Sequence, residues 1–514
     1  MTRSRRGSCS LALAVTATVV YLPLFALLVA ALSQATTVGR IAREVFLDPS
    51  RWVLFLRSLV LAGLAGALST MLGLVAGYAI AGSPVRRQKA MAALLCLPLL
   101  IPPFVHALSW IMLGNRLGLS IHGLGAAVTV LGLSYCPVAA LLAWTGFSQQ
   151  GADVVHAARL GPTRFRAFWR IEVGMIRPHL ATAFLLTSLF SFSDYGVPSL
   201  FRVVTYPVFV FSQFAAFQDL RSGLLVCWPY VLLALMAAVT WRWLNPRKLF
   251  EVSQRGSLRE ASPVSWRGNA PWKAAYAGIV CVTAVLPLLT LLLSAGSWKM
   301  YVKALETASG QVWTTLGLAA VAAALMVVLG LWLASSTQRS GPGQASVMDY
   351  ALLLPVALPG TLFGLGLIFL WNRPSMQVIY GTPLVLIHLY VARFLPFAVF
   401  SQASGMAQIH SNLRDAARLA TCSRWRRLWR VTLPLAAPAM LVAWALGFVL
   451  SAHELTGTLL VVPPGVETLA VRIYSLYHYA VGNLVAALCL ILVAIGALMA
   501  ALAAWGCRCL HKHY

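Results

Sequence analysis

Long apolar segments recur along the whole chain, and they constrain its fold more than any other feature. Each is about 20 residues long, which is the length that an α-helix needs to cross the hydrocarbon core of a bilayer. Apolar residues make up 60% of the 514 residues and charged residues only 10%. We count about twelve such segments and predict an all-α polytopic membrane protein. They lie near residues 11–32, 56–80, 90–112, 123–147, 179–200, 223–244, 274–295, 314–335, 350–371, 381–402, 435–461 and 482–506.

The basic residues lie mostly in loops between these segments. A net charge of +26 is compatible with nucleic-acid binding, but the charges cluster in the loops 150–178, 242–273 and 407–434. Positive loops are typical of the cytosolic side of a membrane protein. We therefore expect both termini in the cytosol, a lipid bilayer around the chain and no nucleic-acid partner. The segment 11–32 is too long for the apolar part of a signal peptide and is interpreted as a retained helix.

The chain consists of two similar halves. Residues 1–245 and 274–514 each contain six apolar segments, and a polar, basic linker joins them at 246–273. Halves with six spans enter the membrane from the same side, so we expect two parallel six-helix repeats with a substrate path between them. Matched prolines should break one helix in each half, because proline lacks a backbone N–H. The repeated features are Leu22-Pro23 and Leu286-Pro287, Pro98 and Pro355, Pro102 and Pro359, Ser191 and Ser451, and Asp194 and Glu454.

A short phrase is repeated in one predicted cytosolic loop of each half. The first copy contains Ala157-Ala158-Arg159-Leu160 and the second contains Ala416-Ala417-Arg418-Leu419, and further arginines and a tryptophan follow both. The positive-inside rule explains the charge but not the repeated order of residues. Small residues on a helix let another surface approach closely. The repeat therefore indicates two docking sites for a cytosolic partner.

These loops resemble the coupling loops of permease subunits in binding-protein-dependent ABC importers. That family has Glu-Ala-Ala, then Gly, then a Leu-Pro ending. The first copy has His156 at the Glu position and keeps Gly161, whereas the second has Asp415 and Thr421 and keeps Leu433-Pro434. The resemblance covers about 54–248 and 310–505. The fused form is similar to the ferric-iron and thiamine type, on the segments 193–198, 391–397, 453–460 and 467–474.

The resemblance implies a transport subunit of a bacterial inner membrane that is driven by two copies of a separate cytosolic ATPase. A periplasmic or extracellular binding protein would deliver the substrate, with ferric iron, thiamine, a polyamine and a phosphonate all open. The sequence has no Gly-x-x-x-x-Gly-Lys-Ser/Thr loop, so ATP is expected on the partner. We expect no cofactor and no enzyme activity. The implied coupling residues are His156, Ala157, Ala158, Arg159, Gly161, Asp415, Ala416, Ala417, Arg418 and Thr421.

Three ionisable residues fall inside the predicted spans. Insertion of a charged side chain at the centre of a bilayer costs roughly 3 kcal/mol, so each should have a partner or face water. One hypothesis is that Asp194 and Glu454 line the path and favour cations. The alternative is that each carboxylate anchors nearby backbone or pairs with Arg393. The candidate path residues are Ser191, Asp194, Arg393, Ser451 and Glu454.

Two other classes of protein share some of these features. A 12-span ion-coupled secondary transporter also has parallel halves, but it gives no reason for the repeated loop, and the 83–89 loop carries no acid. A membrane enzyme such as a lipid transferase would need a cluster of catalytic residues, whereas His106 and His388 stand alone in apolar spans. The terminal Cys507–His513 segment is too weak a pattern for a metal site, and we expect none.

Overall fold

The computed structural model describes residues 11–32, 48–150, 166, 168–215, 227–244, 270–337, 342–409, 411–420, 423–479 and 482–512. All regular elements in these ranges are helices. Among them, eight are long and apolar enough to cross a membrane, or up to eleven if each of three bent pairs is one span. A shorter apolar helix, α15 (Trp228–Leu244), lies where the sixth span was predicted. The expected class, an all-α polytopic membrane protein, is confirmed.

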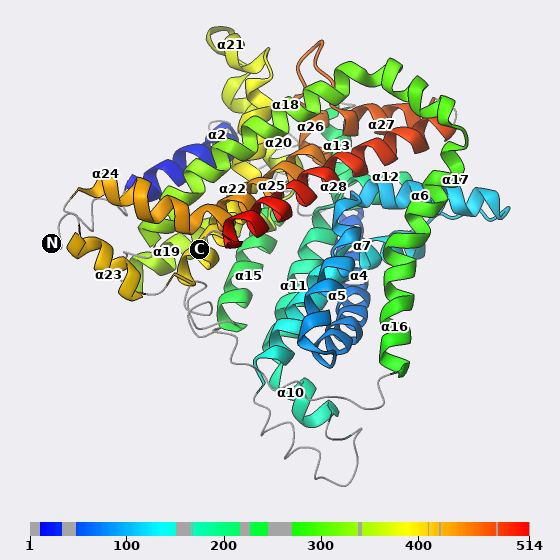
Figure 1. Cartoon of the computed structure of the whole chain (residues 1–514). Coiled ribbons are helices and arrows are strands. Elements are labelled where there is room, and N and C mark those ends of the chain that lie inside the picture. Colours follow the sequence, from blue (N-terminus) through cyan, green and yellow to red (C-terminus); the bar gives the residue numbers. More distant parts are fainter. Residues whose placement is uncertain are drawn as a thin grey trace.

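The main helices of the first half are α4 (Pro49–Ala81), α5 (Val85–Leu95), α6 (Pro103–Arg116), α7 (Leu124–Ser148), α11 (Arg177–Ser193) and α15. In this half, α4, α7 and α11 run side by side, whereas α6 points away from them (Figure 1). Glycines allow α4 and α7 to pack closely: a Cβ atom at Gly73 would lie 2.6 Å from Cβ of Ala139, and one at Gly77 would lie 2.8 Å from the carbonyl oxygen of Ala140. Such small-residue contacts are the usual means of close helix packing in a membrane.

The long helices α18 (Trp298–Thr337) and α28 (Gly482–Lys512) of the second half run across the direction of α4, α7 and α11 (Figure 1). Helix α18 begins at Trp298, well before the predicted boundary at 314, and contains a non-helical residue at Ala308. The main helices of this half are α18 (Trp298–Thr337), α19 (Pro342–Ala357), α20 (Gly360–Trp371), α22 (Leu384–Ala407), α25 (Leu433–Ala452) and α28 (Gly482–Lys512).

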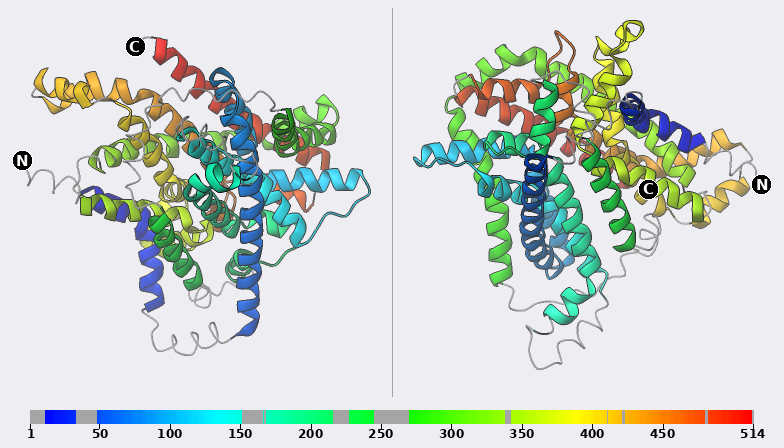
Figure 2. Two further views of the ribbon diagram at one scale, coloured as in Figure 1. Left: turned by 90° about the horizontal axis from the view of Figure 1, so that it is seen from below. Right: turned by 180° about the vertical axis from the view of Figure 1, so that it is seen from behind.

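The first span of each half packs against the other half. The π-helix η1 (Ala17–Tyr21) and α2 (Leu22–Leu32) lie beside α20 of the second half (Figure 1, Figure 2). Likewise α16 (Ala270–Val280) lies beside α4 of the first half, where the hydroxyl of Tyr276 donates to the carbonyl of Met91 at 2.7 Å. We call this arrangement the exchange of first spans. Hydropathy does not predict it, because hydropathy reports the length of a span and not its neighbours.

Prolines also determine how the first spans are held. Pro23 has no N–H for the carbonyl of Val19, four residues earlier. That carbonyl lies 2.9 Å from Nε2 of His388, while Nε1 of Trp371 donates to Nδ1 of the same ring at 3.1 Å. Because an indole can only donate, Nε2 carries the proton and donates to Val19. In the other half, Pro287 follows Thr283 by four residues, and the Thr283 carbonyl lies near the ring of His106.

The two helix breaks expected from the prolines are present. The segment α5–η2 (Leu97–Leu100) meets α6 at a bend of 82°, and α19 meets α20 at a bend of 102°. Pro102 and Pro359 have extended backbone immediately before α6 and α20. The predicted spans 90–112 and 350–371 are therefore broken helices.

Candidate functional site

The fifth and eleventh spans end at their acidic residues. We predicted continuous spans over 179–200 and 435–461, and this was wrong. Helix α11 stops at Ser193 and α25 stops at Ala452. A short helix follows in each half, α12 (Gly196–Leu200) after a gap of two residues and α26 (Thr456–Val461) after a gap of three.

The carboxyl groups explain why both breaks are stable. Oδ1 of Asp194 accepts the N–H of Val197 at 2.8 Å, and Oε1 of Glu454 accepts the N–H of Gly457 at 2.8 Å. A side-chain oxygen that caps a helix start satisfies a backbone donor that has no partner within the helix. Within a bilayer no water replaces that partner, so the cap matters more. Both acids thus anchor backbone in matching places.

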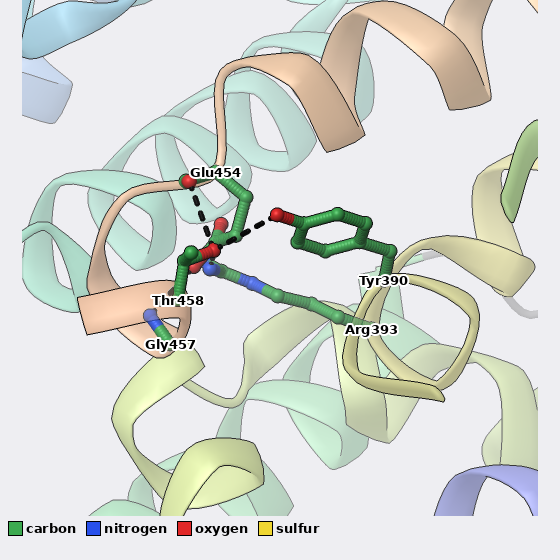
Figure 3. Close-up of polar contacts among 5 residues, drawn as sticks. All are labelled: Tyr390, Arg393, Glu454, Gly457 and Thr458. Carbon is green, nitrogen blue, oxygen red and sulfur yellow. Dashed lines mark hydrogen bonds and ion pairs between the residues drawn. The ribbon is translucent and has the colours of Figure 1, made fainter. Parts of the chain in front are cut away.

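Glu454 makes a second contact that Asp194 lacks (Figure 3). Its Oε2 accepts from Nη1 of Arg393, which extends from α22. Beside this ion pair, the hydroxyls of Tyr390 and Thr458 lie 3.2 Å apart, and Thr458 donates to the carbonyl of Glu454 at 3.1 Å. The side chain of Arg393 is 18% exposed and that of Glu454 only 6%, so the carboxylate is the more enclosed partner.

A glycine makes room for this ion pair. A Cβ atom at Gly360, the first residue of α20, would lie 2.8 Å from Oε1 of Glu454 and would press against the guanidinium of Arg393. The break between α19 and α20 therefore positions bare backbone directly beside the charged pair.

Asp194 belongs to the same electrostatic cluster. It interacts with the charges of both Arg393 and Glu454, and Tyr135 on α7 interacts with all three. The halves touch here, since a Cβ atom at Gly196 would lie 3.4 Å from the side chain of Leu455. The two matched acids thus lie at the junction of the halves, where Arg393 is paired with Glu454 and also interacts electrostatically with Asp194. Tyr135 was not among the predicted path residues. A repeated spacing was the available signal: Tyr135 precedes Pro137 by two residues, and Phe394, the neighbour of Arg393, precedes Pro396 by two.

The two candidate serines sit one helical turn before the acids. Ser191 and Ser451 are each 2% exposed. Neither hydroxyl has a hydrogen-bond partner within the part of the chain that the structure describes. Polar atoms without partners are costly in an apolar environment. Their presence beside Asp194 and Glu454 marks this junction as a polar centre within the membrane.

A second polar contact joins the halves close by. Tyr195 follows Asp194, and Tyr474 lies on α27 (Leu469–Tyr477) of the second half. The hydroxyl of Tyr474 lies 3.1 Å from that of Tyr195 and 3.0 Å from that of Ser199. The rings of Tyr195 and Phe211 are in contact, with centroids 4.3 Å apart and planes tilted by 34°.

The second predicted coupling loop forms an exposed helix. Asp415, Ala416, Ala417 and Arg418 lie in α23 (Ser411–Ala420), which α24 (Arg424–Arg427) follows. Figure 1 shows both helices projecting from the body of the protein. Leu419 is 90% exposed and Leu413 is 53% exposed. His156, Ala157, Ala158, Arg159, Gly161 and Thr421 lie outside the described residues.

The chain re-enters the membrane differently after each loop. In the first half, the ring of Phe168 contacts Tyr78 and Trp272, with centroids 4.7 and 5.9 Å apart. Trp272 begins the exchanged span of the second half. In the second half, Trp425 and Trp429 contact each other at 5.6 Å and are 67% and 56% exposed. Phe168 is thus packed into the protein, whereas Trp425 and Trp429 are exposed, as is Trp169 of the first half at 47%.

No group of three or more His, Cys, Asp or Glu side chains suited to a metal ion occurs within the described ranges. His106 and His388 are both hydrogen-bonded, His106 through Nδ1 to the Ser134 hydroxyl at 2.9 Å. Both histidines, which stand alone in apolar spans, are therefore packed and hydrogen-bonded residues.

Comparison with known proteins identifies what this arrangement is similar to. Residues 326–506 match the family described as "Binding-protein-dependent transport system inner membrane component". A Haemophilus influenzae protein named as a ferric transport system permease protein, FbpB 1, is 25% identical over 479 residues, which cover 83% of this chain and 72% of that protein. A Salmonella typhimurium protein named as a 2-aminoethylphosphonate transport system permease protein, PhnV, is 33% identical over 187 residues. That match covers 36% of this chain and 69% of PhnV. The ferric transport system permease protein FbpB of Actinobacillus pleuropneumoniae is 22% identical over 439 residues, covering 76% of this chain and 62% of that protein.

Proposed function

This chain belongs to the family of inner membrane components of binding-protein-dependent transport systems, and from that premise we propose that it carries ferric iron across the membrane. It is the multi-pass permease subunit of an ABC importer and a transport subunit rather than an enzyme. The observation that supports ferric iron as the cargo is the polar centre at the junction of the halves, which holds two carboxyls and one guanidinium.

We assign the driving force to a separate ATPase on the cytosolic side. Two ATPase copies would bind the two coupling loops, at 156–161 and 415–421, and the halves 1–245 and 274–514 would move as repeats around the 246–273 linker. Support comes from α23, which presents Leu413 and Leu419 to its surroundings. A binding protein would deliver the cargo from the opposite side, with both termini in the cytosol. Deletion of residues 153–170 should abolish co-purification of the ATPase, and full retention would contradict docking at this loop.

We propose that cargo passes the centre formed by Ser191, Asp194, Arg393, Ser451 and Glu454. An excess of acid over base attracts cations and repels anions. The backbone caps do not oppose this role, because each cap occupies one carboxylate oxygen, Oδ1 of Asp194 and Oε1 of Glu454. The second oxygen of Glu454 is held by Arg393, so a passing cation would compete with that guanidinium.

Isosteric variants test the role of the acids without removing the caps. The double variant Asp194→Asn/Glu454→Gln keeps an oxygen for each backbone N–H but removes both negative charges. In proteoliposomes that contain the permease, its ATPase and its binding protein, we expect ATP-dependent uptake of radioactive Fe(III) to fall at least tenfold. The control Glu467→Gln removes an acid outside the centre, where Glu467 contacts Gln311 and Arg472. Normal uptake by the double variant, with the ATPase still bound, would reject the centre as part of the path.

A 2-aminoethylphosphonate cargo is the second candidate, because the relative named for that compound is 33% identical. The phosphonate group is anionic and would meet two carboxyls at the centre, which favours iron. The same proteoliposomes distinguish the two when each labelled compound is offered separately. Uptake of the phosphonate without uptake of iron would show that the cargo is the phosphonate and not iron. The assignment of the protein as an importer would stand. Uptake that followed an ion gradient rather than ATP would instead support a secondary transporter.

A further inference from the structure

An apolar groove lies between α2 and α20, on a face that the described helices leave open. It encloses about 370 Å³ and is lined by Leu22, Phe25, Ala26, Val29, Phe369, Leu370 and Arg373. Phe25 is 58% exposed and Val29 is 46% exposed. In a membrane protein, apolar side chains exposed on a spanning helix face lipid.

The groove follows from how the two helices meet. They are in tight contact at one level, where a Cβ atom at Gly366 would lie 3.0 Å from Cβ of Pro23 and closer still to the Pro23 carbonyl. The lining residues continue from Leu22 toward Val29 on α2, and from Phe369 to Arg373 at the end of α20. Contact at Gly366 therefore gives way to an open slot toward the C-terminal ends of both helices.

Arg373 carries the only charge among the residues that line this groove. Its side chain is exposed and takes part in none of the ion pairs found among the described residues. It lies two residues after Trp371, whose ring is fixed by the hydrogen bond to His388. Tryptophan is enriched at the depth of the lipid headgroups. Arg373 thus lies at the end of the apolar slot and two residues from a tryptophan, which is the arrangement expected of a basic residue at headgroup depth.

We propose that this groove binds one anionic phospholipid, with an acyl chain along Phe25 and Phe369 and the phosphate on Arg373. Arginine pairs with phosphate through two parallel hydrogen bonds, and basic residues near a membrane surface attract anionic lipids. The absence of acid from the lining favours a negatively charged headgroup. Because this site joins the exchanged first span to the second half, a bound lipid would seal that contact. The proposal is independent of the cargo.

Native mass spectrometry of the full chain in detergent tests this site. Dioleoyl phosphatidylglycerol and dioleoyl phosphatidylcholine have the same chains, so a difference between them reports the headgroup. We expect one phosphatidylglycerol to remain bound at higher collision energy than phosphatidylcholine. The variant Arg373→Gln should weaken its binding about fivefold, the effect of one basic residue near a lipid surface. The matched control Lys299→Gln removes an exposed basic residue beside an exposed tryptophan, Trp298, outside the groove.

A second variant separates the slot from the charge. Ala26→Phe should fill the groove and release the lipid while Arg373 stays in place. Equal retention of both lipids, or unchanged binding by Arg373→Gln and Ala26→Phe, would overturn the proposal. Equal weakening by Lys299→Gln would overturn it as well, since binding would then follow net charge alone. Dimers that Ala26→Phe dissociates would show instead that a second copy of the chain fills the groove.

Discussion

The hydroxyl of Tyr195, in the first half, lies 3.1 Å from the hydroxyl of Tyr474, in the second half. The same Tyr474 hydroxyl lies 3.0 Å from that of Ser199, so one phenol links two residues across the junction. Alternating access requires the halves to separate on one side of the path at a time. This contact closes the junction next to Asp194 in the state described.

Removal of the Tyr474 hydroxyl should therefore loosen the junction. Tyr474→Phe keeps the ring but loses both hydrogen bonds, which together are worth about 1 kcal/mol in a membrane protein. We expect amide hydrogen exchange in α27 to become about fivefold faster. Tyr479→Phe is the control, because Tyr479 is 90% exposed. Unchanged exchange in Tyr474→Phe would show that the contact does not hold the halves together.

The Arg393–Glu454 ion pair should show strong coupling between its two residues. Arg393→Met leaves the carboxylate of Glu454 enclosed without its guanidinium, and breaking a buried pair in this way costs about 3 kcal/mol of unfolding free energy. Glu454→Gln should cost less, because Arg393 is more exposed than Glu454 and the amide still caps Gly457. The double variant should recover most of the loss. Denaturant unfolding in detergent measures this cycle, and simple additivity of the two losses would argue against a coupled pair.

His388 should be essential for holding the first span. His388→Leu leaves the Trp371 N–H and the Val19 carbonyl without a partner, at a cost of about 2 kcal/mol. His388→Gln offers both a donor and an acceptor and should recover part of that stability. Thermal unfolding of the purified variants tests this order. Equal stability of the leucine and glutamine variants would mean that the imidazole acts only by filling space.

The apolar tip of α23 should contribute to binding of the ATPase. Burial of a leucine side chain is worth about 2 kcal/mol, so Leu419→Ser should weaken the complex at least tenfold. Leu119→Ser provides the control, because Leu119 is 58% exposed in the loop between α6 and α7. Titration of the ATPase onto immobilised permease measures the affinity. A loss of the same size in the control would assign the effect to general destabilisation.

Several features could be predicted because one residue type determines them. Apolar segments of membrane length identified the spans, and the prolines at 102 and 359 marked two real breaks because proline removes a backbone donor. The breaks at Asp194 and Glu454 were not visible in the same way, since a hydropathy window averages one acid over many apolar neighbours. The repeat of Ser and acid in both halves was the available signal. From it we weighed two roles for the acids, and the alternative in which each carboxylate anchors nearby backbone or pairs with Arg393 is confirmed by the caps on Val197 and Gly457 and by the Arg393–Glu454 ion pair.

The contacts between the halves could not be predicted from either half alone. Tyr135 and Gly360 approach the charged centre only because α7, α20 and α22 converge there, and no local pattern encodes that convergence. The exchanged first spans are a similar case, because the residues that hold Val19 are supplied by α20 and α22.

The exchange of first spans also has a consequence for how the protein is made. Val19 and its partner His388 are 369 residues apart, so the first helix leaves the ribosome long before its final neighbour exists. The nascent helix must wait in the bilayer without its docking surface. Conversely, α4 and α5 wait for Trp272 and Tyr276, which arrive only after the first half has been translated. Neither half can complete its packing before synthesis of the other has begun. Translation of both halves from one message, as a single polypeptide, meets this requirement.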